Sequence, residues 1–221
     1  MAEADPFPAE PSSLAEKAYY EIRRRIVSLE LPPGAVIDER ALTESLGIGR
    51  TPVREALRRL SQEQLVEVYP RRGMFVTAVE IRDLASLCEV RTVLESHAAH
   101  LAAERATLDE LQELQALIEE LGRQGQPDQR ELMELDERIH RAVYRCTHNP
   151  FLEQTLGEYY VLALRIWHLA LDRASGLDAA VQSHRRLLSA IVRGDADAAA
   201  RIMRKHVGDF ERAMRPALLR T

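Results

Sequence analysis

The sequence has few cysteines, few aromatic residues and no long apolar run. Its only cysteines, Cys88 and Cys146, lie far apart in apolar, helix-like stretches, so we expect reduced, buried thiols of a cytoplasmic protein rather than a disulfide. Phe, Trp and Tyr make up 5% of the 221 residues, whereas Leu, Ala, Arg and Glu are abundant, which favours helices over sheets. No stretch approaches the roughly 18 uninterrupted apolar residues of a membrane helix, so no membrane association is expected.

The chain also lacks an excess of positive charge. It carries 30 Lys and Arg against 35 Asp and Glu, a net charge of −5, so DNA binding requires a local basic patch. Residues 13–78 hold 11 basic and nine acidic side chains, whereas residues 79–221 have a net charge of −4. Residues 1–12 are acidic and proline-rich and lack the apolar segment of a signal peptide, which predicts a disordered tail.

Residues 13–78 begin with the pattern of two helices. Apolar residues recur at helical spacing at Leu14, Ala18, Ile22, Ile26 and Leu29. This helix must end before Pro32, because proline has no amide hydrogen and clashes with the preceding turn. Asp38 is a suitable N-cap for a second, short helix that ends at Gly47.

A third helix and a hairpin complete this domain. Thr51 is predicted as the N-cap, and Pro52 as the first residue, of a helix that continues to Leu65. Alternating apolar residues at 66–70 and 73–79 predict a two-stranded hairpin, or wing. Two helices joined by a short glycine-containing turn, followed by a wing, form a winged helix-turn-helix DNA-binding domain.

Basic residues lie where such a domain meets DNA. Arg50 and Arg54 share one face at the start of the third helix, the end that enters the major groove, where an arginine fork can bind guanine. Thr51 is placed to contact a phosphate, and Arg40 to contact the DNA backbone. On electrostatic grounds Arg72, with Gly73 at the wing tip, is expected to reach the minor groove.

Residues 79–221 read as a mainly α-helical domain. Their long amphipathic stretches and few breakers predict six helices, at 81–105, 107–123, 128–147, 150–172, 177–193 and 195–215. Because the connections are short, neighbouring helices are expected to run antiparallel in a bundle. The predicted fold is therefore mainly α, with an N-terminal winged helix-turn-helix and a C-terminal antiparallel helical bundle.

Four potential metal ligands lie on three of these helices. Asp136 and His140 are four residues apart and share one helix face, and the other two ligands are His184 and His206. One carboxylate and three imidazoles can converge inside a bundle on a divalent metal with an open position. The alternative is that these histidines are ordinary surface or core residues, which is common for a histidine on a helix.

Two arginines in apolar surroundings are candidates for contacts with an anion. Apolar neighbours (Leu87, Val90, Leu94 and Ala98) predict that Arg91 points into the bundle, where it needs either a carboxylate such as Glu95 or a bound ligand. We favour the ligand. Arg165 has a similar setting, and a structural ion pair is its alternative role.

Residues 13–76 resemble the N-terminal domain of the GntR family of bacterial transcription regulators. Three elements carry the resemblance: LPPG at 31–34, RTPVREALRRL at 50–60 and RRG at 71–73. The resemblance implies a homodimer on a pseudo-palindromic operator in double-stranded DNA. By position in the motifs, it implies DNA contacts from Arg40, Arg50, Thr51, Arg54 and Gly73.

The C-terminal region resembles the FCD ligand-binding domain of FadR-type members of that family. The matching elements are EVRTVLE at 89–95, LDERIH at 135–140, CTHNPFL at 146–152, and the helices of His184 and His206. The resemblance implies a mononuclear metal held by Asp136, His140, His184 and His206, with a carboxylate effector that completes its coordination and contacts Arg91. Six helices resemble the shorter VanR-like branch. Zinc is the first choice of metal, and nickel, manganese and iron also suit these donors.

The sequence therefore predicts a ligand-controlled regulator, such as a repressor, whose effector is a small organic acid. One alternative is a metal-dependent hydrolase in which Glu137 acts as the general base, because DERIH resembles the HExxH motif with Asp in place of the first His. No oxyanion hole is apparent for that reaction, and a hydrolase gives no reason for a winged helix. The other alternative is a DNA-binding protein with a purely structural metal.

Overall fold

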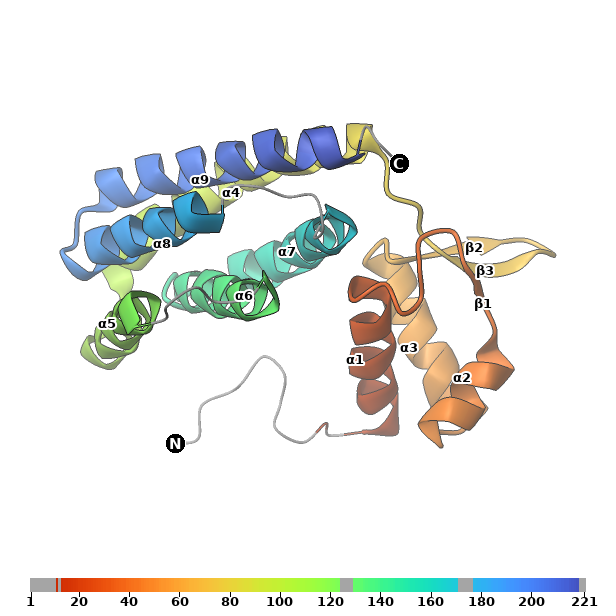
Figure 1. Cartoon of the computed structure of the whole chain (residues 1–221). Helices are drawn as coiled ribbons and strands as arrows, with labels where there is room; N and C mark the ends of the chain where they lie inside the picture. Colours follow the sequence, from red (N-terminus) through yellow and green to blue (C-terminus); the bar gives the residue numbers. More distant parts are fainter. Residues whose placement is uncertain (1–10, 12, 124–128, 171–176, 219–221) are drawn as a thin grey trace. The chain divides into compact units, whose positions relative to one another are not determined.

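The computed structural model describes residue 11 and residues 13–123, 129–170 and 177–218 of the chain. The chain divides into two compact units, residues 1–79 and 80–221 (Figure 1). The tail predicted at 1–12 lies outside the described residues, except for Pro11.

Three helices form the core of the first unit. They are α1 (Leu14–Val27), α2 (Glu39–Leu46) and α3 (Arg50–Gln62). Apolar side chains of α1 and α3 are fully buried against one another, at Ala18, Ile22, Ile26, Val53, Leu57 and Leu60. The first and last apolar residues of the pattern predicted for α1 are not part of this core. Leu14 is 60% exposed, and Leu29 follows the helix with a positive φ of 62°.

The predicted cap of α2 is confirmed. The Asp38 carboxylate accepts hydrogen bonds from the amides of Arg40 and Ala41, at 2.8 and 3.1 Å. Gly47 ends the helix in the left-handed region, at φ 63°, where a side chain is disfavoured.

Replacing Asp38 by alanine is expected to destabilise the protein by about 0.5–2 kcal/mol, because two amides at the start of α2 lose their acceptor. Urea unfolding followed by circular dichroism measures this difference. Asp38→Asn, which keeps a side-chain oxygen at the cap, is the matched control and should lose less. Equal stability of the alanine variant and the parent protein would contradict the capping role.

The predicted start of α3 is wrong by two residues. The helix begins at Arg50 with Gly49 as its N-cap, so Thr51 and Pro52 lie within the first turn and Thr51 caps nothing. Proline is tolerated here because the amides of the whole first turn have no acceptor within the helix. The first hydrogen bond of the helix runs from the amide of Val53 to the carbonyl of Gly49, at 3.4 Å.

The predicted wing is confirmed, and a short third strand joins it. Strands β2 (Val66–Tyr69) and β3 (Gly73–Val76) pair antiparallel, with Tyr69 opposite Gly73. Strand β1 (Val36–Ile37) pairs with the other edge of β3, so the order is β1-β3-β2. The sequence did not predict β1, because two residues cannot show an alternating pattern.

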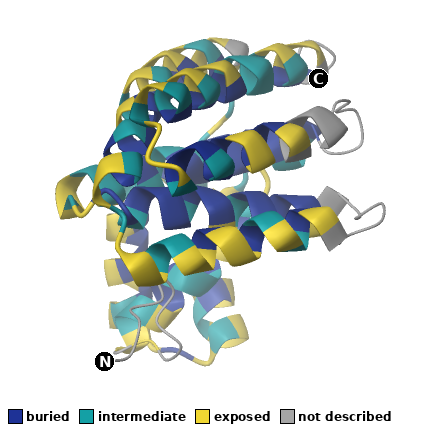
Figure 2. Cartoon of the chain, turned by 90° about the vertical axis from the view of Figure 1, so that its left-hand side faces the viewer, coloured by how far each residue is buried: buried dark blue, intermediate teal, exposed yellow. Residues whose placement is uncertain are grey.

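The described part of the second unit contains six helices, as the sequence predicted. Their bounds are α4 (Ile81–Arg105), α5 (Leu108–Arg123), α6 (Gln129–Arg145), α7 (Pro150–Ala170), α8 (Leu177–Val192) and α9 (Ala196–Leu218). The antiparallel pair α4 and α9 lies side by side along most of its length (Figure 1). Figure 2 shows that buried residues line the faces where these helices meet, whereas exposed residues follow their outer faces. The predicted connections at 124–127 and 173–176 lie outside the described residues, as do positions 128, 171 and 172 of the predicted helices.

Both cysteines are free and buried in this second unit. Burial raises the pKa of Cys88 to about 11 and that of Cys146 to about 12, so both thiols stay protonated at neutral pH. Among the described residues, no helix combines the length and the apolar character needed to cross a bilayer.

Candidate metal centre and nucleic-acid interface

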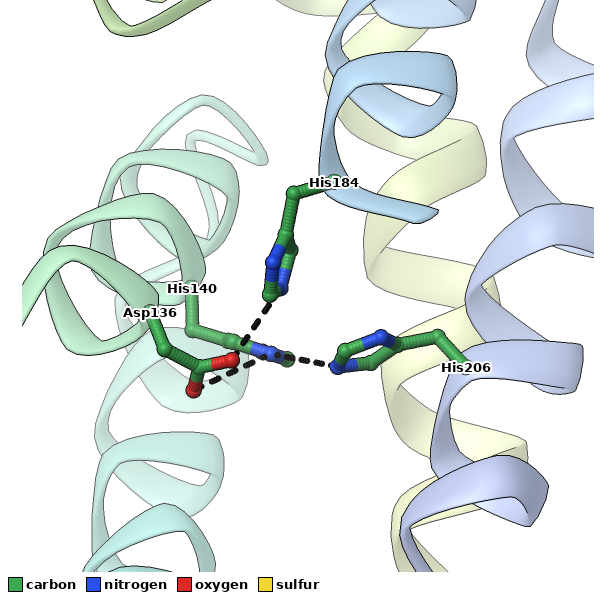
Figure 3. Close-up of side chains that lie close together, drawn as sticks. All are labelled: Asp136, His140, His184 and His206. Atoms are coloured by element: carbon green, nitrogen blue, oxygen red, sulfur yellow. Dashed lines mark hydrogen bonds and ion pairs between the residues drawn. The ribbon is translucent and has the colours of Figure 1, made fainter. Parts of the chain in front are cut away.

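Three helices bring the four predicted metal ligands to one point inside the bundle. Asp136 and His140 lie one turn apart on α6, and His184 on α8 and His206 on α9 point toward them (Figure 3). Their exposed fractions are 6%, 0%, 3% and 8% in that order. Such deep burial of four polar side chains requires that they satisfy one another or a bound group.

The distances between these side chains suit a single cation. His140 Nε2 lies 3.2 Å from His206 Nε2, and His184 Nε2 lies 3.2 Å from Asp136 Oδ1. One donor atom from each residue can be chosen so that all four lie within 4.8 Å of one another. Ligands bound at about 2.1 Å to one metal are about 3.0–3.4 Å apart when they are neighbours in the coordination shell.

The donors themselves fit a divalent transition metal. Nitrogen and carboxylate oxygen are ligands that zinc, nickel, manganese and iron accept. Moreover, the buried Nε2 of His184 makes no hydrogen bond to any described residue, although Asp136 is close. A buried nitrogen without a partner is costly, and a metal would satisfy it.

Two tyrosines and a glutamate surround the cluster. The Tyr160 hydroxyl donates to Asp136 Oδ2 at 2.5 Å, and the other carboxylate oxygen, Oδ1, faces His184. Nδ1 of His140 lies 2.9 Å from Glu95 Oε2 and 3.1 Å from the Tyr144 hydroxyl. Neither tyrosine was predicted from the sequence. Tyr144 is one turn after His140 and was detectable from that spacing, whereas only the packing of α7 on α6 reveals Tyr160.

Burial keeps two of the imidazoles neutral. Desolvation, opposed by Asp136 and reinforced by the nearby His140, lowers the pKa of His184 to about 4. Desolvation also lowers the pKa of His206 well below its usual value, and the neighbouring histidines add to this effect. Neutral imidazoles have the free lone pair that metal coordination requires.

Arg91 is buried as predicted, and it is paired with Glu95. The guanidinium Nε donates to Glu95 Oε1 at 2.5 Å, and Arg91 is 2% exposed. Burial alone would raise the pKa of Glu95, but Arg91 and His140 together lower it to about 2, so the carboxylate is ionised. The predicted alternative, a pair with Glu95, is thus the contact present, because Glu95 lies one helical turn from Arg91 on the same buried face of α4.

One end of the Arg91 guanidinium lacks a partner among the described residues. Its Nη1 is buried and makes no hydrogen bond within the described parts of the chain. The guanidinium carbon lies 5.7 Å from the ring centre of Tyr160 and 5.3 Å from that of Phe210. Arg165, on α7, is buried as well, at 1% exposed, and its contact with an effector stays a prediction.

Glu137 does not join the cluster. Its carboxylate accepts two hydrogen bonds from Arg141, one of them at 2.8 Å from Nε, on a partly exposed face of α6. Asp136 therefore points to the cluster while its neighbour points elsewhere, as the 100° step between successive helical residues requires.

The residues predicted to contact DNA are all exposed on the first unit. The exposed set contains Arg40, Arg50, Thr51, Arg54, Arg72 and Gly73. Arg54 Nε donates to Glu39 at 2.7 Å, and its Nη1 and Nη2 have no hydrogen bond to any residue that the structure describes. The outer fork of this guanidinium is therefore open toward solvent. Gly73 has a φ of 98°, which keeps the wing tip free of a side chain.

Comparisons with known proteins agree with this architecture. Residues 14–76 match the family model described as "Bacterial regulatory proteins, gntR family", and residues 86–209 match the FCD domain. A helix-turn-helix transcriptional regulator in an unstable DNA locus of Streptomyces ambofaciens is 34% identical over 86% of this chain and 80% of its own length. The galactonate operon transcriptional repressor of Escherichia coli is 28% identical over 80% of this chain and 86% of its own. Among solved structures, McbR of E. coli superposes with a TM-score of 0.76 at 26% identity, over 90% of this chain and 98% of that one.

Proposed function

The chain belongs to the GntR family of bacterial transcription regulators and carries an FCD domain, and from this we propose a metal-dependent sensor of small carboxylates. In this proposal, a homodimer binds a pseudo-palindromic operator in the bacterial cytoplasm. A carboxylate metabolite bound in the second unit changes the affinity for that operator. The family and the similar proteins are transcription regulators, not enzymes, and the position of Glu137 away from the cluster offers no support for a hydrolase.

One observation carries the proposal: four buried donors from three helices converge at Asp136, His140, His184 and His206. We assign these residues as the ligands of a divalent metal, with zinc as the first choice. A bound cation supplies a Lewis-acidic position that attracts a negatively charged oxygen. None of the four is a cysteine, and closed structural zinc sites usually contain cysteine, so the donor set favours an exchangeable site over a structural one.

Arg91 supplies the second anchor for an anion. Its Nη1 lacks a hydrogen-bond partner among the described residues, and an arginine fork matches a carboxylate. The aromatic rings of Tyr160 and Phe210 beside it suit the carbon skeleton of a small metabolite. The similar E. coli repressor is named for the operon of galactonate, a sugar acid, which agrees with an organic acid as the effector class.

The DNA contacts are assigned to the exposed residues of the first unit. Arg50 and Arg54 would enter the major groove from the start of α3, and Thr51 and Arg40 would contact the DNA backbone. Arg72 and Gly73 at the wing tip would reach the minor groove.

Arg54→Ala is expected to weaken binding to the selected operator by about 1–3 kcal/mol and to relax the base preference at one position of each half-site. Fluorescence anisotropy with the operator and single-base variants measures both effects. Arg58→Ala removes the same charge from the same helix. It should weaken binding to every duplex by a similar amount, and by less than Arg54→Ala weakens binding to the operator. If Arg54→Ala weakens every duplex equally, Arg54 is a phosphate contact and the assignment to a base is wrong.

The proposal is tested with the full chain and a duplex selected from random-sequence DNA. Native mass spectrometry and elemental analysis report the oligomer and the metal. Anisotropy is then measured with added zinc and with each member of a panel of acetate, malonate, citrate and gluconate. We expect at least one acid to change operator affinity by about 5–150-fold, and DNA to change the affinity for that acid by the same factor. Failure to select any duplex, or a metal that stabilises the fold while no acid alters DNA binding, would overturn the proposal.

A further inference from the structure

Glu95 connects the anion-binding arginine to a ligand of the candidate metal centre. Its side chain is fully buried on α4, with Arg91 on one side and His140 on the other. Oε1 accepts from Arg91 Nε at 2.5 Å, and Oε2 lies 2.9 Å from His140 Nδ1. The four ligands of the proposed metal do not include Glu95.

The free oxygen of this carboxylate decides which nitrogen of His140 carries a proton. Oε2 makes no regular hydrogen bond to any described residue, and a buried carboxylate oxygen without a donor is costly. An ionised carboxylate only accepts, so its contact with Nδ1, 2.9 Å away, is electrostatically favourable when Nδ1 bears the hydrogen, although the hydrogen bond of regular geometry at that nitrogen is the one to Tyr144. The Tyr144 hydroxyl, 3.1 Å from the same nitrogen, also hydrogen-bonds Glu95, and when it donates to this carboxylate it can only accept from Nδ1, which favours the same tautomer.

The other nitrogen of His140 then carries the lone pair, which accepts a hydrogen bond from Nε2–H of His206 as long as no metal is bound. Nε2 faces the cluster, 3.2 Å from His206 Nε2 and 3.8 Å from Asp136 Oδ2. Metal-ligating histidines commonly donate their second ring nitrogen to a carboxylate, which fixes the tautomer and the ring orientation.

We propose that Glu95 is a positioning residue that holds His140 in the Nδ1–H tautomer with Nε2 ready to bind a metal, and that Arg91 orients Glu95 for this task. This inference depends on the proposed function in one respect only, which is that a metal binds to Nε2. The same guanidinium therefore contacts the predicted effector through Nη1 and the ligand network through Nε. Binding of an anion at Arg91 acts on the metal centre through one carboxylate.

The orientation set by Arg91 makes Glu95→Gln a sharp test. The oxygen of the glutamine must face Arg91, because the guanidinium can only donate. Its amide NH₂ is thereby turned toward His140 Nδ1, which must then accept. The variant should hold His140 in the opposite, Nε2–H form, whose proton blocks coordination.

The first measurement uses the full chain without metal, with ¹⁵N-labelled histidine and long-range ¹H–¹⁵N correlation NMR at pH 8. The His140 signals are assigned by their loss in His140→Asn. We expect an unprotonated Nε2 in the parent protein and a protonated Nε2 in Glu95→Gln. A protonated Nε2 in the parent protein overturns the inference, and this result does not depend on whether the variant folds.

The second measurement is zinc affinity, by competition with a chromophoric chelator. Glu95→Gln should bind zinc about 10–100-fold more weakly than the parent protein. Glu104→Gln, an exposed position on the same helix, is the matched control and should bind as the parent does. Equal affinity in Glu95→Gln and the parent overturns the role of Glu95 while the metal proposal stands. A parent protein that binds no zinc, nickel, manganese or iron overturns the proposed function, and the tautomer of His140 still decides the inference.

Discussion

Arg91→Met is expected to lower the free energy of unfolding by about 3–5 kcal/mol. The substitution keeps most of the apolar volume of the side chain but leaves the ionised, fully buried Glu95 without its cation. Breaking one side of a buried ion pair costs more than the pair itself contributes, because the remaining charge is neither solvated nor paired. Chemical denaturation of the metal-free protein, followed by circular dichroism, measures this change.

The double variant Arg91→Met/Glu95→Leu is the matched control. It removes both charges and should recover much of the loss, since apolar replacement of a buried pair is often close to neutral. His140 loses its carboxylate neighbour in the double variant, so the recovery is not expected to be complete. A double variant less stable than Arg91→Met alone would show that the pair is not the source of the effect.

Zinc is expected to stabilise the parent protein by about 2.7 kcal/mol when its free concentration is 100 times the dissociation constant. His184→Ala should abolish this gain at the same zinc concentration, because it removes the only ligand from α8. Thermal unfolding with zinc and with EDTA gives the comparison. His97→Ala, an exposed histidine on α4, should respond to zinc as the parent does. A stabilisation that persists in His184→Ala would place the zinc elsewhere.

Long periodic patterns made most of the fold predictable. The six helices of the second unit match their predicted ranges within a few residues, because clear breaks separate long stretches rich in apolar and helix-forming residues. Local details at element ends were less accessible. The start of α3 was misplaced because Thr51 and Pro52 have the residue types of a cap, while the backbone turns two residues earlier, at Gly49.

The residues of the candidate site were easier to predict from the sequence than the contacts between them. Asp136 and His140 share a helix face by spacing alone, but only tertiary packing brings His184 and His206 to them. For the same reason, the prediction from the sequence favoured a bound ligand over Glu95 as the partner of Arg91. An (i, i+4) pair is visible in the sequence, whereas its burial, which makes the pair obligatory, depends on the packing of α9 and α6 over α4.

The spread of the four donors along the chain has a consequence for biosynthesis. His206 follows His140 by 66 residues and lies on the last of the three contributing helices. A nascent polypeptide whose synthesis has not reached α9 offers three donors at most and cannot close the bundle around them. If these donors hold the proposed metal, loading follows translation of α9, and divalent ions then compete for the completed four-donor site. The identity of the resident ion should accordingly vary with the metals supplied in the growth medium.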